Sequence, residues 1–94
     1  MPEVSKLQPP PAIHQAEMAL EIARIWIVDN KQVVSLSSAN WEDPRAWGLM
    51  LVDLAKHVAN VYEKQGHNRH EVLAKIHQAF LAEWNHPTDE PTEM

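Results

Sequence analysis

The 94-residue chain contains no cysteine and has only two glycines, Gly48 and Gly66. Without cysteine it can form no disulfide, no thiolate nucleophile and no cysteine-type zinc site. Two isolated glycines cannot form the flexible loops that cradle nucleotides, and the sequence has no phosphate loop, dinucleotide fingerprint or calcium loop. These absences argue against redox, nucleotide-dependent and calcium-dependent functions, and we expect no cofactor.

The chain also lacks a surplus of positive charge. Its formal net charge is −5, and residues 18–84 carry seven Lys or Arg against eight Asp or Glu. Such a nearly neutral body has no basic stripe that could neutralise phosphates. Nucleic acid and anionic membranes are therefore not expected partners.

No long hydrophobic run is present. The longest, residues 47–52, is far too short to cross a bilayer, and the first residues do not have the pattern of a signal peptide. These features predict a cytoplasmic protein.

Both ends differ in composition from the middle of the chain. Residues 1–17 include a proline triplet, and residues 86–94 are acidic and interrupted by two prolines, so we expect both segments to be flexible. Residues 18–85 then form a single domain. About seventy residues make a small core, and a second copy of the chain could help to bury its apolar faces.

Two runs rich in β-branched residues predict an antiparallel hairpin. They are "LEIARIWIV" (20–28) and "QVVSLSS" (32–38), separated by a polar turn at 29–31. Both faces of the first strand are largely apolar, since Ala23, Ile25 and Ile27 share one and Trp26 lies on the other. A rival interpretation continues a helix through residues 12–25, and we keep a short helix or turn possible before Met18.

Helical periodicity replaces the alternating pattern in the second half of the chain. A helix is predicted over 44–65, with Gly66 as its stop, and a second helix over 69–84. The short connection makes the two helices antiparallel neighbours. The expected fold class is α+β: an antiparallel β-hairpin followed by two antiparallel α-helices (ββαα).

The stretch "WEDPRAWG" (41–48) has two interpretations. As a helix start, Asp43 caps the free amides ahead of a proline that suits the first turn, and Gly48 allows close approach of a strand or of Trp26. As a ligand site, three tryptophans wall a pocket and an arginine anchors an anion. The residues of this second interpretation are Trp26, Trp41, Arg45 and Trp47. The helix start is favoured, because caps and core tryptophans are common.

The blocks "WEDPRAWGLMLVDLAKHVANVY" and "FLAEWNHPTDEP" resemble a family of small bacterial proteins, the domain of unknown function 5076. The resemblance covers roughly residues 20–91. It implies a compact α+β domain and brings no catalytic residues with it.

Six histidines are many for this length, and three of them lie in "HNRHEVLAKIH" (67–77). His70 and His77 are two turns apart, about 10.5 Å along a helix, whereas zinc ligands must each lie within about 2.1 Å of the metal. We therefore predict no metal site and no catalytic residue. Glu83 falls inside the apolar stripe of the second helix, where it either reaches solvent or pairs with an arginine.

The apolar faces exceed what two helices can cover. The favoured function is therefore a small non-enzymatic protein-interaction module, homodimeric or bound to another protein through its hairpin or a helix face. The alternative is a small-molecule-binding protein or minor enzyme that uses the tryptophan-lined pocket.

Overall fold

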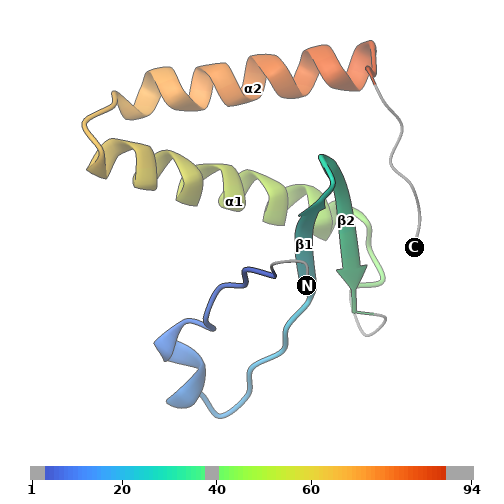
Figure 1. The fold of residues 1–94 in the computed structure, drawn as a ribbon, viewed down its shortest axis with the longest axis vertical. Coiled ribbons are helices and arrows are strands. Elements are labelled where there is room, and N and C mark those ends of the chain that lie inside the picture. The colour runs from blue at the N-terminus through green and yellow to red at the C-terminus, as the bar shows by residue number, and fades with distance from the viewer. Residues whose placement is uncertain (1–3, 38–40, 89–94) are drawn as a thin grey trace.

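The computed structural model describes residues 4–37 and 41–88. Its elements are the 3-10 helix η1 (Pro11–His14), the strands β1 (Ala23–Val28) and β2 (Lys31–Leu36), and the helices α1 (Arg45–Lys64) and α2 (Arg69–Asn85) (Figure 1). This order confirms the predicted ββαα arrangement and the α+β class. Residues 1–3 and 89–94, parts of the two ends predicted to be flexible, lie outside the described residues.

The hairpin forms where the alternating pattern predicts it. β1 and β2 pair antiparallel, with Val28 opposite Lys31 beside the turn and Ala23 opposite Leu36 at the base. Asp29 and Asn30 both have positive φ (49° and 68°), the combination of a type I′ turn, which matches the twist of a hairpin. The first strand begins at residue 23 rather than 20, and the rival helix is reduced to the short η1.

Gly66 stops α1, as the sequence predicts. It takes a φ of 98°, its N–H donates to the Glu63 carbonyl, and the N–H of His67 donates to the Tyr62 carbonyl at 3.1 Å. These two bonds are those of a Schellman motif, which satisfies the free carbonyls of the last turn. Asn68 then starts α2, because its Oδ1 accepts from the Glu71 N–H at 3.0 Å.

The helix pair holds the one fully buried residue of the described chain, Ala59 in α1. Leu73 and Ile76 of α2 are half-buried, and the Arg69 Nε donates to the Asn60 Oδ1 at 2.7 Å.

The end of the helix pair far from the connection is unevenly covered. Trp47 and Met50 of α1 are half-buried there, whereas Phe80 and Trp84 of α2 are exposed. The two helices therefore bury only parts of their apolar stripes.

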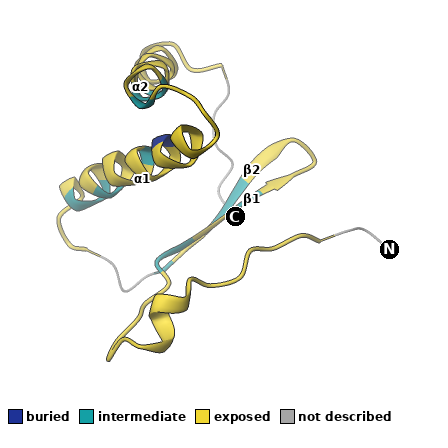
Figure 2. Cartoon of the chain, turned by 90° about the vertical axis from the view of Figure 1, so that its left-hand side faces the viewer, coloured by how far each residue is buried: buried dark blue, intermediate teal, exposed yellow. Residues whose placement is uncertain are grey.

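The hairpin stands apart from the helix pair. Among the described elements, no Cα of either strand lies within 8 Å of a Cα in α1 or α2. In Figure 2 the hairpin extends away from α1, and its outer half is exposed. The chain thus contains two small apolar assemblies that share no core.

The start of α1 agrees with the favoured interpretation of "WEDPRAWG", displaced by one residue. The helix begins at Arg45 with Pro44 in the N-cap position, and Asp43 accepts from the Arg45 N–H at 3.0 Å through its Oδ1. The Arg45 side chain also reaches the Asp43 carboxylate, at 2.9 Å. Hydrogen bonds from the Arg45 side chain, and then from its backbone N–H, lower the pKa of Asp43.

The expected close approach at Gly48 is wrong for a single chain. A Cβ built on Gly48 would meet nothing within 4 Å, and the same holds at Gly66. The two glycines differ in backbone conformation, because only Gly66 has a positive φ. This contrast makes them a matched pair for mutation.

Gly48→Ala should stabilise the protein, because alanine is about 1 kcal/mol better than glycine inside a helix. Thermal denaturation should show a Tm about 4–8 °C higher. Gly66→Ala should lower the Tm, since a Cβ in the left-handed region costs roughly 1–2 kcal/mol. Destabilisation by Gly48→Ala would instead reveal a neighbour at that position in the assembled protein.

Asp43→Asn should lower the Tm at pH 7, because the ionised carboxylate holds Arg45 in the folded state. A lowered folded-state pKa contributes stability that is present above the unfolded value of about 3.9 and is lost as pH falls through the folded value. The Tm difference between wild type and variant should therefore shrink on acidification. Asp53→Asn, the same charge change on the same helix, is the control, and an equal loss in both variants would contradict a specific role for Asp43.

Candidate functional site

The structure brings together two of the four residues of the predicted ligand site. Trp41 and Trp47 make an edge-on contact, with ring centroids 5.1 Å apart and an interplanar angle of 79°. Arg45 lies between them in sequence, but its guanidinium already pairs with Asp43. Trp26 lies on β1, in the hairpin that stands apart from the helices.

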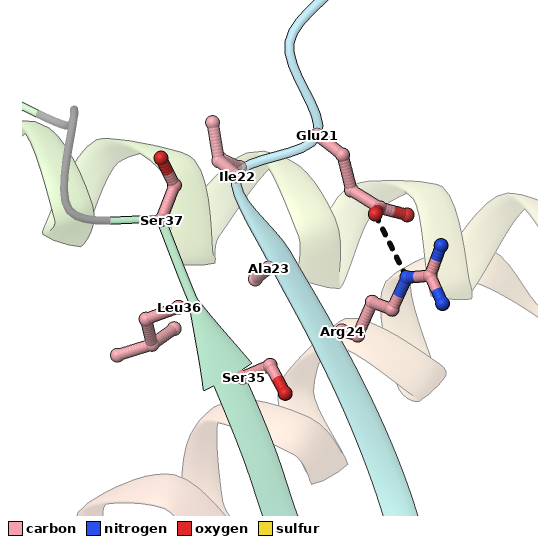
Figure 3. Close-up of a pocket in the computed structure, with 7 residues that line it drawn as sticks. All are labelled: Glu21, Ile22, Ala23, Arg24, Ser35, Leu36 and Ser37. Atoms are coloured by element: carbon pink, nitrogen blue, oxygen red, sulfur yellow. Dashed lines mark hydrogen bonds and ion pairs between the residues drawn. The ribbon is translucent and has the colours of Figure 1, made fainter.

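Two hollows lie at the hairpin. One, of about 230 Å³, opens at the hairpin base between residues 21–24 and 35–37, beside the ion pair of Arg24 with Glu21 at 2.7 Å (Figure 3). The other, of about 600 Å³, runs between residues 5–10 and one side of β1, and Trp26 lines it. Neither is lined by Trp41, Arg45 or Trp47, so the tryptophan-lined site stays a prediction.

No charged or polar side chain of the described residues is fully buried. Within residues 4–37 and 41–88 there is no group of three or more His, Cys, Asp or Glu side chains that could hold a metal ion. Glu83 is exposed, and its Oε1 accepts from the N–H and the hydroxyl of Thr88 at 2.7 and 2.8 Å, which ties the end of α2 to the following residues. None of the described helices is both long enough and apolar enough to span a membrane.

The most prominent feature is a bare aliphatic surface on the hairpin. We call it the aliphatic face: the side chains of Ala23, Ile25, Ile27, Val34 and Leu36, which the register places on one side of the two strands. Ile25, Ile27 and Leu36 are 57%, 72% and 60% exposed. Gln32 is the one polar residue among the paired positions of this face.

The helices expose apolar side chains as well. On α2, Phe80 stacks on Trp84 with centroids 5.7 Å apart, and both rings are exposed. On α1, five apolar or aromatic side chains that share one side of the helix by their spacing are exposed: Leu51, Leu54, Val58, Val61 and Tyr62. Exposed apolar surface of this extent is typical of a protein that binds another macromolecule.

The total accessible surface measures this excess. The chain exposes 9198 Å², whereas a compact monomer of 10.8 kDa exposes about 5,500 Å². Its radius of gyration, 15.7 Å, also exceeds the roughly 12 Å of a compact domain of this length. A single copy is therefore much less compact than a typical folded domain.

Comparison with known proteins identifies relatives of the whole chain. One solved structure has 37% sequence identity and a TM-score of 0.73, and the match covers 95% of this chain and 93% of that one. That structure is described, provisionally, as a pyruvate dehydrogenase from the photosynthetic bacterium Rhodopseudomonas palustris. No curated protein matches the sequence.

The profile of one protein family matches residues 6–88, and therefore includes every described helix and strand. The match agrees with the family that the sequence blocks around residues 41–62 and 80–91 indicate. The chain belongs to the family described as domain of unknown function 5076.

Proposed function

We propose that this protein is a non-enzymatic interaction module that works as a homodimer. The observation that carries the proposal is the aliphatic face of the hairpin, where Ile25, Ile27 and Leu36 are more than half exposed and no Cα of a described helix lies within 8 Å of a strand Cα. Water-exposed aliphatic side chains on a strand pair are costly and invite association. Every copy of the chain carries the same apolar surface, so a second copy is a partner of matching chemistry.

The excess exposed area of each chain is at least as large as the area that a homodimer interface buries. Relative to a compact monomer, each chain exposes an excess of about 3,600 Å². Obligate homodimers bury about 2,000–5,000 Å² in total, up to about 2,500 Å² from each chain. The excess is large enough for such an interface, with the extended N-terminal segment accounting for further exposed area.

The side chains involved can supply the required free energy. Full burial of a leucine or isoleucine is worth about 1.5–3 kcal/mol, and three such residues on the aliphatic face are more than half exposed. Burial of these residues in both copies would offset much of the entropy lost on association. The helices add exposed aromatic side chains at Phe80 and Trp84.

The related structure is described provisionally as a pyruvate dehydrogenase, whereas we propose association and not catalysis for this chain. Redox decarboxylation depends on cofactors, whose chemistry the protein tunes through placed polar and charged groups. The described residues present an apolar surface and isolated surface ion pairs instead. Their arrangement favours association over catalysis.

Sedimentation equilibrium at micromolar concentration tests the dimer directly. The mass should be twice 10.8 kDa, and the Tm should rise with protein concentration because association stabilises only the folded state. A monomer at every concentration, with a sharp thermal transition that does not move, would contradict the proposal.

Leu36→Ser tests the contribution of the hairpin to this association. It removes one exposed aliphatic side chain from the aliphatic face and should raise the dimer Kd at least tenfold, about 1.4 kcal/mol. Leu7→Ser is the control, since Leu7 is 96% exposed and lies outside every helix and strand. Equal effects of the two changes would place the interface elsewhere.

A further inference from the structure

We infer that two copies join edge to edge through β2, forming a four-stranded antiparallel sheet of order β1-β2-β2-β1. This inference rests on the proposed homodimer and specifies its interface. Val34 lies on the two-fold axis and faces the partner's Val34. A two-stranded hairpin is marginally stable alone, whereas three or more strands with an apolar face form a stable sheet.

The backbone of β2 has its unpaired groups in the required places. In a hairpin with a two-residue turn, the residues that flank the turn exchange hydrogen bonds, and bonded pairs then alternate along the strands. The bond from the Ser37 N–H to the Ile22 carbonyl, at 2.9 Å, agrees with this phase. The N–H and C=O groups of Gln32, Val34 and Leu36 therefore point away from β1.

The outward N–H and C=O groups of β2 pair with no other strand among the described residues. Within residues 4–37 and 41–88, the sheet has two strands, and no backbone hydrogen bond joins β2 to any segment outside the hairpin. Proteins protect exposed strand edges with charges, prolines or bulges. From residue 32 to residue 36, β2 has none of these, and its only charged residue, Lys31, lies beside the turn.

The opposite edge of the hairpin is less accessible. Residues 5–10 lie across a cleft from residues 21–26, and this cleft is lined by residues of the β1 side and by none of β2. β1 also carries Arg24 in its paired region, with the guanidinium bound to Glu21. The chain's own N-terminal segment and a charged side chain therefore flank β1, which leaves β2 as the edge for a partner.

The register centred on Val34 is compatible with the side chains. It places Gln32 opposite the partner's Leu36 and Lys31 opposite the partner's Ser37, so no like charges meet. Residues that face each other across antiparallel strands share a face, and a two-fold axis normal to the sheet keeps that face. The aliphatic faces of the two copies thus form one continuous apolar surface.

A cysteine at position 34 tests this geometry, and the cysteine-free chain makes a single new thiol unambiguous. Directly opposite residues of a hydrogen-bonded antiparallel pair have Cα atoms about 5.5 Å apart. That distance lies within the range of about 4.4–6.8 Å that a disulfide can bridge. Val34→Cys should therefore give a cross-linked dimer on mild oxidation, at least ten times faster than Ile25→Cys.

Ile25 provides the matched control because it lies opposite Val34 within the hairpin and its backbone groups point outward from β1. Faster cross-linking of Ile25→Cys would assign the interface to β1 and overturn the inference. If the wild type is a dimer but neither variant cross-links faster than random collision, the β2 edge is wrong while the proposed function stands. A monomeric wild type would overturn both.

Proline variants provide a second measurement that does not depend on disulfide geometry. Val34→Pro removes an outward N–H without removing a β1–β2 hydrogen bond, so it should raise the dimer Kd at least tenfold. Ile25→Pro makes the same change on the other edge and should leave the Kd within about threefold of wild type. Far-UV circular dichroism checks that each hairpin variant folds, and equal effects on Kd would contradict the β2 edge.

Discussion

The constraint on which this structure depends is the cost of leaving a β-hairpin uncovered. Its strands are rich in isoleucine and valine, yet among the described residues no strand Cα lies within 8 Å of a helix Cα and much of the hairpin is exposed. A small chain has little core to spare, because its surface is large relative to its volume. In the proposed dimer a second copy eases this constraint, because a four-stranded sheet pairs the open edge of β2 and is more stable than a lone hairpin.

The same constraint explains why the helix pair and the hairpin are separate structural units. The helix pair is stabilised locally, by an Asn68 cap, a Schellman turn at Gly66 and the packing around Ala59. The hairpin is defined locally too, by a type I′ turn at Asp29 and Asn30. Local signals thus specify each half, whereas the stability of the whole requires contacts between halves or between copies. In the proposed dimer, association would therefore complete the fold.

Much of the fold could be predicted from sequence because its signals are local. The turn residues, the helical period after Pro44 and the stop at Gly66 all act over a few residues, and each element lies where they indicate.

The packing could not be predicted in the same way. Gly48 suggested a close neighbour that the single chain lacks, and the helical period of α1 predicted an apolar face, but periodicity states which face is apolar and not what covers it. The tryptophans show the same limit, since Trp26 has the chemistry of a pocket wall but lies on a separate element.

Amide hydrogen exchange of the two strand edges tests the central claim most directly. Val34 and Ile25 both point their N–H groups away from the hairpin, so in a lone chain both should exchange at nearly unprotected rates. Edge-to-edge pairing of two copies through β2 predicts strong protection at Val34, which weakens on dilution, and fast exchange at Ile25. Fast exchange at both positions, at concentrations where the protein is folded, would contradict the account.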